Sequence, residues 1–255
     1  MSFIKTETRG PILIITLDRP EARNAFNRAM AKEMEAIIDA FEGDTQLRAA
    51  VIQANGPTFS AGQDLKAAAV GEGATTKARG GFGIMGKPPT KPLIAAIEGQ
   101  ALAGGMELSL CCDMIVASKA AVFGLAETKR ALVAVGGGCF RLPRRVPYHI
   151  AMEMILTAEP KPAEEMHRLG YVNSLVEPGG ALDEALRLAA LVARNGPLAV
   201  RAAKEIAARS HAEQWTDAEG WEKQRPIVAP AHNSADRAEG LRAFAEKRDP
   251  VWTGV

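Results

Sequence analysis

Apolar positions in the first sixty residues alternate between strand-like runs and one helical stripe. The run 12–17, ILIITL, is rich in β-branched residues and predicts a strand, paired with the more polar segment before Gly10. Over 27–41 the apolar residues recur at helical spacing and charged residues occupy the other face, which predicts a helix ended by Gly43. The run 49–54, AAVIQA, predicts a buried strand. The chain is therefore expected to begin as strand, helix, strand.

The middle of the chain continues this alternation. A β-branched run, PLIAAIE, predicts a strand, and the apolar run MELSLCCDMIVA that follows its small-residue junction predicts a helix. Further elements are a strand, a helix opened by GGGCFRL, and a helix followed by a short strand, expected at 121–124, 136–158 and 163–178. By contrast, 67–89 is rich in Gly, Ala and Thr without a period, which predicts a loop or a poorly ordered helix.

The C-terminal part has helical periodicity only. Helices are predicted over 181–194, from Pro197 onward, and over 234–247. Pro197 suits a first helical position, and the preceding Asn195-Gly196 marks a boundary. We therefore expect an α/β core over 1–195 and a helical tail over 196–255.

Composition excludes several classes of function. The chain of 255 residues is 47% hydrophobic and carries a formal net charge of +1, which gives no general attraction to nucleic acid or acidic membranes. No run has the length of a membrane span, and the N-terminus lacks the apolar core of a signal peptide. The three cysteines form no CxxC pair and the four histidines are scattered, so we expect a cytoplasmic protein with reduced thiols and no metal site.

The stretch 99–113, GQALAGGMELSLCCD, carries the first candidate chemistry. Glycines at the start of a helix let another molecule approach backbone N–H groups that have no intrahelical partner, and Glu107 lies in the first turn. This pattern indicates half of an oxyanion hole with a catalytic carboxylate. The alternative is ordinary helix punctuation, with Glu107 complementing the helix dipole.

A second corner has the same design. The strand after position 54 leads into FSAGQDLK, where the exposed N–H is expected at Ala61 and Gly62 permits the tight turn. Ser60 is not favoured as a nucleophile, because Gly-x-Ser-x-Gly is absent and no partner histidine is identifiable. The GGG junction at 136–138 lacks the lysine and spacing of a phosphate loop. The nearby basic cluster Arg141, Arg144 and Arg145 is interpreted as a set of helix-end ion pairs.

Taken together, LDRPEARNA, FSAGQDLK, GQALAGGMELSLCCD, FGLAE, GGG…RLPR and EGLRAFAEKRDPVW resemble the crotonase superfamily, the enoyl-CoA hydratase/isomerase family. The resemblance covers nearly the whole chain. It implies an α/β crotonase spiral of repeated β-β-α units, with a C-terminal helical oligomerisation region that forms a homotrimer or a dimer of trimers. The position of segment 67–89, just after one expected oxyanion donor and before the other, suggests a lid over an acyl pocket, and a plain surface insertion fits about equally well.

By motif match, the resemblance implies that Ala61 and Gly104 supply the oxyanion hole and that Glu107 and Glu127 are the catalytic carboxylates. Arg23 and Lys66 are placed near the phosphates of coenzyme A. The coenzyme A contacts fall on residues of the two corners and the turn before them: Arg23, Ala25, Ser60, Ala61, Gln63, Asp64, Leu65, Lys66 and Gly105.

Two glutamates favour a hydratase that adds water across the 2,3 double bond of an enoyl-CoA, since an isomerase needs only one base. No cofactor is implied, because coenzyme A enters as part of the substrate. The rival function is carnitinyl-CoA dehydratase (crotonobetainyl-CoA hydratase), followed by an enoyl-CoA delta isomerase. A binding protein that recognises RNA is a different class, supported only by the basic cluster.

Overall fold

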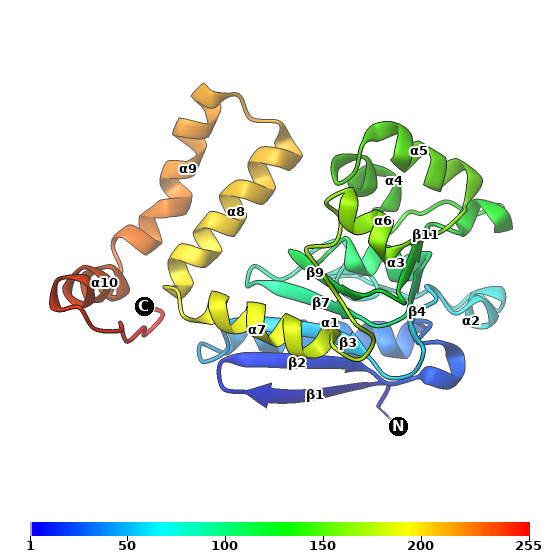
Figure 1. The fold of residues 1–255 in the computed structure, drawn as a ribbon, viewed down its shortest axis with the longest axis horizontal. Coiled ribbons are helices and arrows are strands. Elements are labelled where there is room, and N and C mark those ends of the chain that lie inside the picture. Colours follow the sequence, from blue (N-terminus) through cyan, green and yellow to red (C-terminus); the bar gives the residue numbers. More distant parts are fainter. Residues whose placement is uncertain (1) are drawn as a thin grey trace.

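The computed structural model describes residues 2–255, whose strands form two main sheets and one small hairpin (Figure 1). The larger sheet has six strands in the order β1-β2-β3-β7-β9-β12 and the smaller has four in the order β11-β10-β8-β4. Bounds in the larger sheet are β1 Ile4–Arg9, β2 Ile12–Leu17, β3 Ala49–Ala54, β7 Leu93–Ile97, β9 Met114–Ser118 and β12 Ser174–Val176. Bounds in the smaller sheet are β4 Thr58–Ser60, β8 Gln100–Leu102, β10 Val122–Gly124 and β11 Lys161–Pro162.

Successive strands alternate between these two sheets. The pairs β3/β4, β7/β8 and β9/β10 each place one strand in the larger sheet and the next in the smaller one. Within each sheet, every new turn of the chain adds a strand parallel to the preceding one. The result is a spiral of β-β-α units, as the resemblance implies.

Helices connect the turns of the spiral and cover its faces. Their bounds are α1 Arg28–Gly43, α2 Leu65–Ala69, α3 Gly104–Ser109, α4 Gly138–Arg141, α5 Tyr148–Thr157, α6 Ala163–Arg168 and α7 Ala181–Ala193. The amphipathic α1 is capped by Asn27, whose side chain accepts the N–H of Met30 at 2.9 Å. Its apolar stripe joins the main core, while alanines of α7 form a second core against the other face of the larger sheet.

The helix predicted over 106–117 is wrong in its second half. Helix α3 ends at Ser109, and Met114–Ser118 is strand β9, parallel to β7. The side chain of Asp113 accepts the N–H of Leu93 at 2.8 Å, and the N–H of Asp113 donates to the carbonyl of Leu93. This pairing with a distant strand overrides the local helical periodicity.

Segment 67–89 is more ordered than its composition predicts. It contains the hairpin of β5 (Thr75–Thr76) and β6 (Gly80–Gly81), and then buries Phe82 and Met85 in the main core. Arg79 fastens it to α1 through an ion pair with Asp39 at 2.7 Å. A role as a lid remains a prediction.

The C-terminal region consists of α8 (Pro197–Glu213), α9 (Asp217–His232) and α10 (Ala235–Glu246). The sequence did not predict α9, because Pro226 and Pro230 lie inside it. In Figure 1, α8 and α9 form a pair that projects away from the sheets, and neither contains a buried residue. Among residues 2–255, no helix combines the length and apolarity required to span a bilayer.

Candidate active site

The first corner is the junction of β8 and α3. Ala103 has a positive φ of 52° and starts the helix, and the two following glycines fit where side chains would clash. A Cβ at Gly104 would lie 2.5 Å from the ring of Phe82, and one at Gly105 would lie 2.0 Å from the carbonyl oxygen of Ser60. This packing fixes the first turn of α3 and directs Glu107 into the protein, where it is buried.

The second corner, between β4 and α2, meets the first. Gly62 has φ of +94°, and a Cβ on it would lie 2.8 Å from the amide nitrogen of Gly104. The expectation for Ala61 requires correction, because its N–H donates to the carbonyl of Arg23 at 3.0 Å and is not free for a ligand. The two corners are adjacent, as expected, but the free amide is a different one.

Gln63 supplies that free amide. Phe26 donates to the carbonyl of Gly62 at 2.8 Å and accepts the N–H of Asp64 at 2.9 Å, so Phe26 forms a parallel bridge with Gln63, the residue between them. In such a bridge, the N–H of the intervening residue points away from the partner strand. Within residues 2–255, no hydrogen-bond acceptor is recorded for the N–H of Gln63 or of Gly104.

Glu107 is held by a turn of three glycines, Gly136–Gly138, which we call the three-glycine turn. Its Oε1 accepts the N–H of Gly138 at 2.9 Å. A Cβ at Gly136 would lie 2.6 Å from Oε2 of Glu107, so only glycine permits this close approach. The pKa of Glu107 is raised, because burial outweighs the N–H groups of Gly138 and Gly136 and the charge of Arg141, which all lower it.

Glu127 has a different environment. It begins a short 3-10 helix, η2 (Glu127–Arg130), and its Oε2 is buried without a hydrogen-bond partner in the described chain, residues 2–255. Burial, and then the charge of Glu107, raises the pKa of Glu127 to about 7. The Glu107 carboxylate is thus stabilised by backbone donors and the Glu127 carboxylate is not, so Glu127 is the group more readily protonated near neutral pH.

The segments that carry both glutamates converge on Gly138. Leu125, two residues before Glu127, lies so close that a Cβ at Gly138 would be 2.9 Å from its side chain. The charges of Glu107 and Glu127 both act on the exposed thiol of Cys139. The structure therefore brings together the two glutamates that the motifs identify.

The residues expected around coenzyme A divide into exposed and internal groups. Arg23 and Lys66 are exposed cations, and the carbonyl of Arg23 is bonded to the same corner that precedes α2. Leu65 and Gln63 are also exposed. These four lie where a ligand could reach them, although the contacts themselves stay predictions.

Other expected coenzyme A contacts have internal roles. Ser60 is fully buried, and its hydroxyl donates to the carbonyl of Asn24 at 2.9 Å, so that expectation is wrong for its side chain. Asp64 caps α2 and pairs with Arg19 at 2.8 Å. Ala25 and Gly105 are buried, and the carbonyl of Ala25 accepts a hydrogen bond from Arg19 at 2.9 Å.

The basic cluster is not a set of ion pairs, contrary to the prediction. Within residues 2–255, none of Arg141, Arg144 and Arg145 has a carboxylate within salt-bridge distance. Arg141 instead donates to the carbonyls of Met85 at 2.7 Å and Gly136 at 3.3 Å. These bonds could not be read from the sequence, because the acceptors are backbone atoms of other segments.

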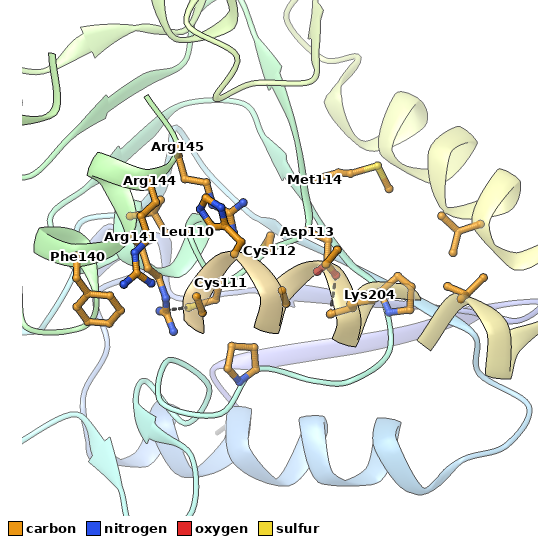
Figure 2. A pocket seen from close by; sticks show the side chains of 18 residues that line it. Leu110, Cys111, Cys112, Asp113, Met114, Phe140, Arg141, Arg144, Arg145 and Lys204 are labelled. Carbon is orange, nitrogen blue, oxygen red and sulfur yellow. Dashed lines mark hydrogen bonds and ion pairs between the residues drawn. The ribbon is translucent and has the colours of Figure 1, made fainter. Parts of the chain in front are cut away.

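A separate cavity of about 610 Å³ lies between α8 and the core, and neither glutamate lines it. Figure 2 shows Arg141, Arg144 and Arg145 on one side of this cavity, and Lys204 on α8 paired with Asp113. Within residues 2–255, no group of three or more His, Cys, Asp or Glu side chains is arranged to hold a metal ion.

Comparisons with known proteins identify the family. The family described as "Enoyl-CoA hydratase/isomerase" matches residues 7–255. The chain is 43% identical to a carnitinyl-CoA dehydratase of Citrobacter koseri, over 96% of each chain. It is 38% identical to the enoyl-CoA hydratase EchA19 of Mycobacterium tuberculosis, over 96% of this chain and 94% of that protein.

Solved structures extend the match to three dimensions. A crystal structure of an enoyl-CoA hydratase from Mycobacterium tuberculosis H37Rv superposes with a TM-score of 0.96 at 49% identity, and the match covers 100% of both chains. Sequence motifs, spiral topology and structural likeness all lead to one assignment. The chain belongs to the enoyl-CoA hydratase/isomerase family of the crotonase superfamily.

Proposed function

We propose that this protein is an enoyl-CoA hydratase, a hydro-lyase that adds water across the 2,3 double bond of an enoyl-CoA thioester. The observation that carries the proposal is the unequal environment of Glu107 and Glu127 beside two adjacent strand-to-helix corners. Hydration needs a base for water and an acid for Cα, and these two carboxyl groups differ in the required sense.

The N–H groups of Gly104 and Gln63 form the oxyanion hole in this proposal. Water addition moves electron density onto the thioester oxygen, and preorganised donors oppose that charge. Support comes from the contact between Gly62 and the nitrogen of Gly104 and from the outward orientation of the Gln63 amide. Loss of one such donor typically costs about 2.7–4 kcal/mol of barrier.

The glutamates divide the proton transfers. Ionised Glu107 takes a proton from water as the water oxygen bonds to Cβ. Neutral Glu127 gives its proton to Cα as the Cα–Cβ double bond becomes a single bond. After one turnover Glu107 is protonated and Glu127 is ionised. Glu107 then loses a proton to solvent and Glu127 gains one, which restores the starting state. General acid–base steps of this kind contribute about 10²–10⁴-fold each.

Coenzyme A enters along the second corner, where Arg23 and Lys66 face its phosphates. Both side chains are exposed and have no acidic partner within residues 2–255. Charge-assisted contacts from such cations suit phosphate groups. No cofactor is required by these steps.

The acyl chain is the least determined part of the substrate. Loop residues next to Ala134 and the three-glycine turn expose apolar side chains, including Leu132, Val133 and Val135. This apolar rim suits a hydrocarbon chain better than a quaternary ammonium, which prefers an aromatic cage or a carboxylate. Carnitinyl-CoA dehydratase remains the second candidate, because several of the similar curated proteins carry that name.

A panel of enoyl-CoA thioesters tests the proposal, with crotonobetainyl-CoA included and loss of the conjugated-enoyl absorbance as the readout. We expect turnover of straight-chain enoyl-CoAs with little or none of crotonobetainyl-CoA. Preferred turnover of crotonobetainyl-CoA would establish the second candidate. Formation of a shifted double bond without water addition would instead establish an isomerase.

We also propose that the chain works as a homotrimer or dimer of trimers in the cytoplasm, with residues 196–255 as the oligomerisation region. Support comes from α8 and α9, which contain no buried residue, and from exposed Trp221, Leu241 and Phe244 in the helical tail. Such unpartnered apolar groups mark interaction surfaces. A solution mass measurement that yields a monomer at micromolar concentration would overturn this assignment.

A further inference from the structure

Arg141 connects three separate segments around Glu107. Its guanidinium donates to the carbonyl of Met85 at 2.7 Å, to that of Gly136 at 3.3 Å and to Sγ of Cys111 at 3.2 Å. Figure 2 shows the contact with Cys111. Cys111 in turn donates to the carbonyl of Glu107 at 3.3 Å. One side chain thus joins the end of the 67–89 segment, the three-glycine turn and the segment that bears Glu107.

This junction is tightly packed on the side of the carboxylate. A Cβ at Gly136 would lie 2.5 Å from Sδ of Met85 and 2.6 Å from Oε2 of Glu107, while one at Gly137 would lie 2.7 Å from Nη1 of Arg141. Movement of either segment would therefore shift the N–H of Gly138 that holds Glu107. The guanidinium fork fixes both segments at once.

Arg141 also provides positive charge where two acids share a site. It is half-buried and has no carboxylate in salt-bridge contact within residues 2–255. The titratable and charged groups that act on this region are Glu107, Glu127, Cys111, Cys139 and Arg141 itself. Burial raises the pKa of Cys111 to about 11, so this thiol is neutral and Arg141 is the cation facing Glu107.

We propose that Arg141 is a positioning residue that keeps the Glu107 carboxylate aimed and ionised by fastening the three-glycine turn and the Met85 segment around it. The inference rests on the proposed function, in which Glu107 is the base. Arg141 touches no substrate in this account. It acts through Glu107. Because Glu107 stays ionised, Glu127 is the carboxyl group that carries the exchangeable proton.

The test uses Arg141→Gln, Arg141→Lys and the control Arg168→Gln in the full-length protein. Arg168 is exposed on α6 and forms no recorded side-chain hydrogen bond within residues 2–255. Thermal unfolding identifies folded variants. The readout independent of turnover is the titration of Glu107, followed by NMR of protein with 13C-labelled glutamate carboxyls and assigned with Glu107→Gln.

We expect Arg141→Gln to move the Glu107 titration midpoint upward by about one pH unit, since a nearby opposite charge typically lowers a carboxyl pKa by about 1–3 units. Arg141→Lys restores the midpoint in part, because it keeps charge but loses the fork. In kinetics, Arg141→Gln lowers kcat by about 10–100-fold, the scale expected for a misplaced catalytic group. Arg168→Gln changes neither quantity.

A folded Arg141→Gln protein with an unchanged Glu107 midpoint would overturn the inference, even if its activity fell. A double variant adds a second criterion: in the Glu107→Gln background, removal of Arg141 should change kcat by less than about threefold. Additive losses would contradict action through Glu107. If the native protein hydrates no enoyl-CoA, the proposed function fails while the titration still tests Arg141.

Discussion

Gly62 and Gly104 lie so close that a Cβ on Gly62 would be 2.8 Å from the amide nitrogen of Gly104. These residues are 42 positions apart, and each belongs to a strand-to-helix corner of a different turn of the spiral. The contact sets the spacing between the two corners. In the proposed mechanism, the neighbouring amides of Gln63 and Gly104 bind the thioester oxygen.

The first prediction concerns this contact. Gly62→Ala forces a side chain against Gly104 and imposes a positive φ on alanine, which separates the corners. We expect kcat for crotonyl-CoA to fall by about 10²–10³-fold, the cost of one lost oxyanion donor. Steady-state kinetics with crotonyl-CoA measures the effect.

Gly71→Ala is the matched control. Gly71 also has a positive φ, of +79°, but a Cβ there meets no atom within 4 Å. This variant carries the conformational cost without disturbing the corners, and its kcat should stay within about twofold of native. Equal losses in the two variants would show that backbone strain, not the contact, determines activity.

The corners illustrate what the sequence could and could not predict. Glycines before a helix and a glutamate in its first turn predict a free amide and a carboxylate at this corner, and the family resemblance assigns the amide to Gly104. The sequence assigns the free amide of the second corner to Ala61, because no local pattern shows that this N–H donates to the carbonyl of Arg23. Which amide is free depends on hydrogen bonds between segments distant in the chain.

The same distinction explains the errors in secondary structure. Helices with a clear apolar stripe, such as α1 and α7, were predicted within a few residues. The sequence of strand β9 has helical periodicity, and only the tertiary pairing with β7 makes it a strand; the internal prolines of α9 argue locally against a helix. The contacts of Arg141 had no sequence signal beyond a cluster of positive charge.

The second prediction is a loss of hydration activity above neutral pH. The pKa of Glu127 is raised to about 7, and the neutral form is the acid that protonates Cα. As pH rises through that value the active form is depleted, so kcat should fall by up to tenfold per pH unit above about 7. Rates in overlapping buffers at constant ionic strength give the profile, and a kcat that rises steadily from pH 7 to 9 would be incompatible with this role.

The third prediction links the same carboxyl to stability. Because folding raises the pKa of Glu127, the native state binds more protons than the unfolded state between the ordinary value of 4.5 and about 7, and stability falls as pH rises through this window. Glu127→Gln removes the loss of stability that comes from ionising this buried carboxyl group. Relative to native, its free energy of unfolding should increase by about 1–2 kcal/mol from pH 4.5 to 8, after allowance for partial solvent screening.

Urea unfolding at several pH values measures this difference, and Glu222→Gln is its control. Glu222 is an exposed glutamate on α9, and its substitution is the matched control. A Glu127→Gln curve parallel to the native curve at every pH would mean that the Glu127 carboxyl titrates normally in the folded protein.

The most direct test of the account is the rate of crotonyl-CoA hydration by Glu107→Gln and Glu127→Gln, each shown to be folded by a cooperative thermal unfolding transition. The buried carboxyl groups act as a base and an acid on one substrate, so loss of either should lower kcat by at least about 10²-fold. Retention of more than about half of the native kcat by either folded variant would contradict the mechanism of two glutamates.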